Sequence, residues 1–141
     1  MPRKRERKDP AYIREQGDRT AQPKKDRKIT FSYIFLITNT EGQSLKEWEE
    51  LGLLSIMSQR LQFVGQFSCQ QAIQRQYLKP YTKVEFPPDS EFTMPKHISG
   101  VDWTVMHITG NSKEVVAGYI EEDVFYIVFL DKDHKFWPTN R

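Results

Sequence analysis

The residues best suited to chemistry lie together near the end of the chain, in segment 131–137, DKDHKFW. An imidazole has an unperturbed pKa of about 6.5, so His134 could act as a general acid or base near neutral pH. Lys135 could stabilise the charge on a phosphate, and Trp137 could stack on a nucleic-acid base. His134 and Lys135 are therefore candidate catalytic residues, and Trp137 is a candidate nucleic-acid contact. The alternative is a polar chain end whose aromatic rings cap the core.

The spacing of ligand-type side chains does not favour a metal site. Asp131, Asp133 and His134 lie close in sequence, and His97 and His107 could join them. Successive strand residues point to opposite faces, however, and the segment lacks the glycine and the later glutamate of a calcium loop. The sequence also has no phosphate loop, no dinucleotide fingerprint and no Gly-x-Ser-x-Gly motif. We therefore expect no metal and no other cofactor.

A buried strand directly before this segment would hold it in place. Residues 124–130, VFYIVFL, are all apolar, which is typical of a strand that is covered on both faces and lies at the centre of a sheet. Residues 101–108 and 115–120 have the pattern of two more strands. Short polar turns at 110–112 and 121–123 separate the runs. Together they predict a three-stranded antiparallel meander.

Two capping boxes predict two helices upstream of the meander. Ser44 begins the pattern Ser-x-x-Glu, and Ser68 begins the pattern Ser-x-x-Gln. In each pattern the serine hydroxyl accepts a hydrogen bond from the amide three residues on, and the longer side chain reaches back to the serine amide. The predicted helices cover 45–64, with Gly52 as a weak point, and 69–78.

The remaining segments complete an α+β fold. The β-branched and aromatic run 31–37 predicts an N-terminal strand. Four prolines between 79 and 100 exclude a long helix there and leave a short edge strand over 82–86. The predicted architecture is therefore an N-terminal strand, two helices, and a three-stranded antiparallel meander with the helices on one sheet face. We expect a single domain over 29–141.

Residues 1–28 differ in composition from this domain. They carry eleven Lys and Arg against five acids, a net charge of +6, which leaves the rest at −4 of the overall +2. Because they are almost free of apolar side chains, we expect a disordered basic arm. Such an arm adds affinity for polyanions, although a merely solvated leader is an equal alternative. The candidate nucleic-acid contacts in it are Arg3, Lys4, Arg5, Arg7, Lys8, Lys24, Lys25, Arg27 and Lys28.

The sequence indicates a cytoplasmic protein without a membrane partner. Cys69 is the single cysteine, so an intrachain disulfide cannot form. No run approaches the roughly 18 apolar residues that span a bilayer. The basic N-terminus is not followed by the apolar region of a secretory signal.

Two resemblances extend this interpretation. The tail EEDVFYIVFLDKDHKFWP resembles the end of a group of small, uncharacterised bacterial proteins found among mobile elements, which implies no activity. Over 29–138, the order of elements with a basic, aromatic C-terminal tip is similar to the RelE/ParE-like toxin superfamily. Ribonuclease members of that superfamily cleave messenger RNA on the ribosome without a metal. The resemblance implies that Lys113 is the basic residue of the meander and that the catalytic C-terminal group lies near His134 and Trp137.

Two functions remain open at this point. The first is a small RNA-binding or RNA-cleaving toxin-like protein, a metal-independent endoribonuclease in which His134 transfers a proton and Lys113 or Lys135 stabilises the phosphorane. Its partners would be RNA or the ribosome, and a cognate antitoxin. The second is a non-enzymatic protein-interaction module of a mobile element or defence system, which binds through a sheet edge or a helix. Convergence of His134, Lys135 and Trp137 with another basic side chain on a concave surface would favour the enzyme.

Overall fold

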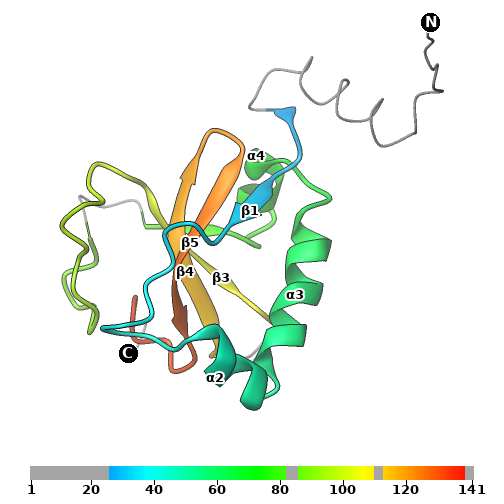
Figure 1. Ribbon diagram of the computed structural model, residues 1–141. Helices are drawn as coiled ribbons and strands as arrows, with labels where there is room; N and C mark the ends of the chain where they lie inside the picture. The colour runs from blue at the N-terminus through cyan, green and yellow to red at the C-terminus, as the bar shows by residue number, and fades with distance from the viewer. Residues whose placement is uncertain (1–25, 82–85, 110–112, 139–141) are drawn as a thin grey trace, which may run out of the picture.

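The computed structural model describes residues 26–81, 86–109 and 113–138, and Figure 1 shows their arrangement. These residues form a five-stranded mixed sheet in the order β1-β5-β4-β3-β2, with three helices between β1 and β2. The α+β class is confirmed. The elements are β1 (Thr30–Ser32), α2 (Leu45–Glu50), α3 (Leu53–Val64), α4 (Cys69–Gln74), β2 (Lys79–Pro80), β3 (Trp103–His107), β4 (Val115–Glu121) and β5 (Val124–Asp131).

The sheet is larger than the three-stranded antiparallel meander that the sequence predicts. β3, β4 and β5 are antiparallel neighbours, but β1 pairs in parallel with β5 and β2 pairs with β3. Both added strands are short edge strands, so each has little sequence pattern of its own. The edge strand expected over 82–86 lies almost entirely outside the described residues, and the described edge is β2, just upstream.

The first predicted helix is two helices. Ser44 caps α2 with the complete capping box, in which its hydroxyl accepts from the Glu47 amide at 3.1 Å and its own amide donates to Glu47 Oε1 at 2.7 Å. Gly52 then adopts φ +77°, a conformation that glycine reaches without a Cβ penalty, and α3 starts at the next residue. The longest helix in the described ranges, α3, has 12 residues, and none of the described helices is long and apolar enough to cross a bilayer.

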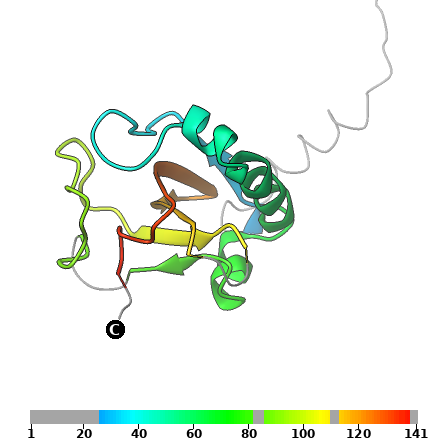
Figure 2. The same ribbon diagram turned by 90° about the horizontal axis from the view of Figure 1, so that it is seen from below.

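The sheet is covered on both faces. The helices lie on one side of it, and the irregular chain after β2 lies on the other (Figures 1 and 2). On the helical side, Trp48, Met57 and Val64 pack with strand residues that include Phe125 and Ile127. The core of the opposite side is rich in aromatic rings and includes Tyr81, Phe92, Ile98, Trp103, Val105, Ala117, Tyr119, Val128, Phe129 and Phe136.

β5 is an interior strand, although β4 and not β5 occupies the middle of the sheet. Phe125 and Ile127 are fully buried toward the helices, and Phe129 is buried toward the aromatic core. The register shifts between Ala117 and Gly118, a β-bulge in which Val128 is the extra residue, so Phe129 lies on the opposite face from Phe125 and Ile127. The polar C-terminal segment follows directly after the end of β5 and lies at one edge of the molecule.

Candidate functional site

The carboxylate of Asp131 holds the C-terminal segment in a tight turn. Asp131 is buried, and its two oxygens accept hydrogen bonds from the backbone amides of Lys135 at 3.0 Å and Phe136 at 2.7 Å. In this turn the backbone of His134 has φ +59°, a value that residues other than glycine rarely adopt. Burial raises the pKa of Asp131, and the backbone hydrogen bonds and the nearby imidazole of His134 partly offset this rise. The Asp131 carboxylate therefore fixes the backbone of the turn that carries His134.

His134 contacts a second histidine, His107, at the end of β3. Their ring centroids are 5.2 Å apart and the rings are inclined at 50°. The strand register explains the contact, because His107 pairs with Val115 and Val115 pairs with Asp131 across the three strands. The buried Nδ1 of His134 has no hydrogen-bond partner among the residues that the structure describes. Within the described ranges, no group of three or more His, Cys, Asp or Glu side chains is arranged to hold a metal ion.

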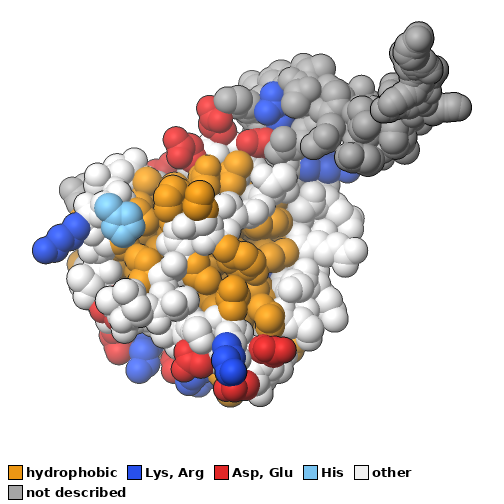
Figure 3. Space-filling view, viewed as in Figure 1, with side chains coloured by type: hydrophobic (Ala, Val, Ile, Leu, Met, Phe, Trp, Pro, Cys, Tyr) orange, Lys and Arg blue, Asp and Glu red, His pale blue; other side chains and the backbone are white. Residues whose placement is uncertain are grey.

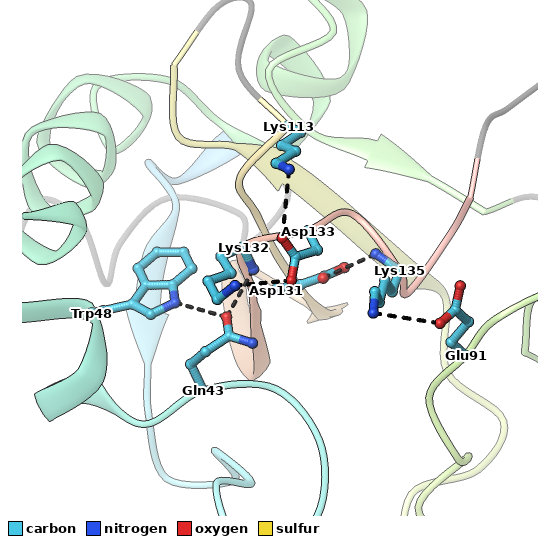
Figure 4. A network of polar contacts seen from close by, with 8 residues as sticks. All are labelled: Gln43, Trp48, Glu91, Lys113, Asp131, Lys132, Asp133 and Lys135. Atoms are coloured by element: carbon cyan, nitrogen blue, oxygen red, sulfur yellow. Dashed lines mark hydrogen bonds and ion pairs between the residues drawn. The ribbon is translucent and has the colours of Figure 1, made fainter. Parts of the chain in front are cut away.

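The lysines around this turn are paired with carboxylates (Figure 4). Lys132 Nζ lies 3.0 Å from Asp133 Oδ2, and Lys113 Nζ lies 3.6 Å from Asp133 Oδ1. Lys135 turns to another carboxylate, with its Nζ 3.8 Å from Glu91 Oε1. The hydrogen bond from Lys132, followed by the positive charges of the lysines, lowers the pKa of Asp133. Lys113 and Lys135, both candidate catalytic residues, are therefore ion-paired with different carboxylates.

A glutamine that the sequence analysis did not single out completes the network. Gln43 Oε1 accepts hydrogen bonds from Trp48 Nε1 at 3.0 Å and from the Lys132 amide at 2.8 Å (Figure 4). The backbone amide of Gln43 donates to the Leu130 carbonyl at 3.0 Å. Gln43 thus joins the chain before α2 to the end of β5. Its position in a polar turn carries no signal of this role.

The two aromatic residues of the tip have separate places. Phe136 is fully buried in the aromatic core. Trp137 packs edge-on against Tyr81, with ring centroids 5.1 Å apart, and lines a small cavity of about 110 Å³ with a proline-rich wall. The described residues that line this cavity include no Lys, Arg or His. His134, Lys135 and Trp137 therefore do not converge there.

Most of the basic arm lies outside the described residues. The prediction that the arm is disordered concerns those residues and stays a prediction. Arg3, Lys4, Arg5, Arg7, Lys8, Lys24 and Lys25 all lie there. Of the candidate contacts that are described, Arg27 is mostly buried, with Nη1 3.9 Å from Asp123 Oδ2, and Lys28 forms a β-bridge with Ser68. Arg27 therefore packs on the domain, whereas Lys28 is exposed and is held there through its backbone.

The largest departure from the expected core is an exposed apolar strip formed by Tyr33, Ile34 and Phe35. The strand predicted over 31–37 leaves the sheet at Ser32, whose hydroxyl accepts from the Ile34 amide at 3.1 Å. The strip residues are 40%, 73% and 37% exposed. Figure 3 shows apolar side chains gathered over β1 and the chain that follows it.

The comparisons with known proteins add no relative. No protein-family model matches the chain, and neither a curated protein nor a solved structure is significantly similar to it. Function must therefore be inferred from the surfaces and contacts of this molecule.

Proposed function

We propose that this protein is a non-enzymatic interaction module that binds another protein through the apolar strip of Tyr33, Ile34 and Phe35. The observation that carries the proposal is Ile34, which is 73% exposed between two exposed aromatic residues. A contiguous exposed apolar surface marks an interaction site more often than a scattered apolar residue does. In this proposal the module belongs to a bacterial mobile element or defence system, in keeping with the resemblance of its tail to small mobile-element proteins.

The strip is also held in shape before binding. The Leu36 amide donates to the Tyr33 carbonyl at 2.9 Å, and the Ile37 amide donates to the Val128 carbonyl at 2.8 Å. The Phe35 ring packs on Tyr126, with centroids 5.3 Å apart. A preorganised surface loses less conformational entropy when a partner binds, so more of the apolar contact appears as affinity.

The polar C-terminal cluster supports the same conclusion. Lys113 and Lys132 share Asp133, and Lys135 pairs with Glu91, so two carboxylates offset most of the positive charge that three lysines would offer to a phosphate backbone. Trp137 lies against Tyr81 and not beside His134. The convergence that would favour an RNA-cleaving enzyme is therefore incomplete.

The Ile34→Asp variant is expected to weaken partner binding by about 30-fold, because it places a charge at the centre of the apolar contact. The partner is first identified by co-purification with the tagged wild-type chain, then purified and titrated by calorimetry. Leu51→Asp is the matched control, since Leu51 is 53% exposed on another surface and gains the same charge. Equal binding by Ile34→Asp, or an equal loss in the control, would contradict the proposal.

A second candidate function is RNA cleavage at the histidine pair, and the contact between His107 and His134 specifically favours it. Two neighbouring imidazoles can divide the roles of general base and general acid without a metal. In this proposal the 2′-hydroxyl of RNA attacks the adjacent phosphate and forms a 2′,3′-cyclic phosphate as the bond between phosphorus and the 5′-oxygen breaks. One imidazole of the pair takes the proton of the 2′-hydroxyl, the other gives a proton to the leaving 5′-oxygen, and His134 has one of these two roles. Lys113 stabilises the phosphorane after exchanging Asp133 for the substrate.

If the histidine pair is catalytic, His134→Asn is expected to lower the rate of RNA cleavage at least about 100-fold. Asparagine is chosen because it tolerates the positive φ of this position better than alanine does. Cleavage of a labelled RNA is followed across pH, and His97→Asn, at an exposed histidine, is the control. Full cleavage by a folded His134→Asn variant, or no cleavage by the wild type, removes this candidate.

A further inference from the structure

A cavity of about 370 Å³ opens beside the apolar strip. Its wall is formed by Phe35, by the loop 97–102, and by the end of β4 at 119–121. This volume falls in the range of sites that hold a ligand or a large side chain. We propose that the cavity binds the cationic side chain of an arginine or lysine from the partner protein. The inference rests on the proposed interaction function and specifies the chemistry of that partner.

The charge of the cavity selects a cation. Asp102 and Glu121 both line it, and both residues are exposed. In the part of the chain that the structure describes, neither carboxylate has a hydrogen-bond donor or a cation beside it, whereas Asp123 and Asp133 are both ion-paired. Among the described residues the lining contains no Lys or Arg, and its one histidine is His97. Figure 3 shows acidic side chains next to the apolar area, at the end where β4 and β5 are joined.

Tyr119 places a hydrogen-bond acceptor inside the cavity. The residue is 6% exposed and lines the cavity. Its hydroxyl has no hydrogen-bond partner among the described residues and is not one of their buried unpaired polar atoms, so it is open to the cavity. Burial, and secondarily the nearby carboxylate of Glu121, raises the pKa of this phenol, so it stays neutral. The N–H group of a bound guanidinium or ammonium would supply the donor that the Tyr119 oxygen lacks.

The aromatic and acidic parts of the wall together favour a cation over a nucleobase, the other ligand that could stack on the rings. Phe35 and Tyr119 are stacked, with centroids 6.4 Å apart and rings inclined at 22°. The face of an aromatic ring attracts a cation electrostatically. A nucleobase could also stack on Phe35, but its phosphates would meet Asp102 and Glu121 at the same opening, where like charges repel. A guanidinium meets both requirements at once.

The test is a titration of the full-length chain with the peptide Ac-Gly-Arg-Gly-NH₂, followed by two-dimensional NMR up to about 20 mM, since a single side chain binds weakly. We expect saturable shifts at 97–102 and 119–121. Glu121→Gln and Asp102→Asn are each expected to weaken binding about fivefold, and Tyr119→Phe about threefold. Glu49→Gln, which removes one carboxylate on α2, is the control and should have no effect.

The peptide result is separable from the result for the apolar strip. Equal shifts with Ac-Gly-Glu-Gly-NH₂, no saturation, or unchanged binding by Tyr119→Phe would overturn the cation site, the last because a diffuse acidic patch needs no hydroxyl. If a protein partner still depends on Ile34 in that case, the interaction proposal stands without the cavity. Saturable arginine binding together with a partner that ignores Ile34→Asp would support the cavity and overturn the apolar strip.

Discussion

Gly118→Ala is expected to unfold the domain, or nearly so, through a clash that no side-chain movement can relieve. A methyl group at Gly118 would overlap the carbonyl oxygen of Tyr126 and lie 2.8 Å from its carbonyl carbon and 3.1 Å from the Ile127 Cα. All of these are backbone atoms of the neighbouring strand β5. The close approach occurs at the β-bulge, where the two strands shift register. Relief would require β4 and β5 to separate.

The expected loss is more than about 4 kcal/mol of unfolding free energy, comparable to the total stability of many small domains. Urea denaturation followed by circular dichroism measures it. Gly52→Ala is the control, because no atom lies within 4 Å of the added methyl there and the cost comes only from the positive φ. That cost is about 1 to 2 kcal/mol. A Gly118→Ala variant as stable as Gly52→Ala would mean that the bulge is absent.

Local patterns predicted the parts of the fold that depend on a few neighbouring residues. Both capping boxes form as expected, at Ser44 and Ser68, because each needs only a serine and a partner three residues on. The run 124–130 became an interior strand because it is apolar on both faces. Gly52, a weak point by helix propensity, is the residue at which the first helix breaks.

Contacts between distant segments were beyond the reach of the sequence. The parallel pairing of β1 with β5 joins residues more than ninety positions apart, for example Thr30 with Val124. The predicted strand ended early because Ser32 and Tyr33 make turn hydrogen bonds, and so the middle of it became the exposed strip. A pattern of apolar residues cannot distinguish a surface that packs on its own chain from one that packs on another.

The candidate site likewise has a part that the sequence predicted and a part that depends on tertiary contacts. The sequence located the chemically useful residues after β5, and it could not show their partners. His107 reaches His134 only through the register of three strands. The pairing of Lys135 with Glu91 depends on the irregular chain that covers the aromatic core. Identical residue types would form an open catalytic cluster or a neutralised structural network, and the tertiary contacts decide between them.

Phe136 anchors the C-terminal segment in the aromatic core, and Phe136→Ala tests how much this contact contributes to stability. Phe136 is fully buried. The distances between its ring centroid and those of its aromatic neighbours are 5.0 Å to Phe86, 5.5 Å to Trp103, 5.9 Å to Phe129 and 6.1 Å to Phe92. Its amide also donates to Asp131, so the ring and the turn are fixed together.

Removing the Phe136 ring is expected to cost about 3 to 5 kcal/mol, since the cavity left behind is surrounded by rigid rings that cannot collapse into it. Urea denaturation measures the loss. Trp137→Ala is the control at the next position, and we expect less than half of the effect because Trp137 is partly exposed and packs edge-on against Tyr81. A larger loss in Trp137→Ala than in Phe136→Ala would reverse these roles. Trp137, and not Phe136, would then be the residue through which the C-terminal segment closes the aromatic face of the sheet.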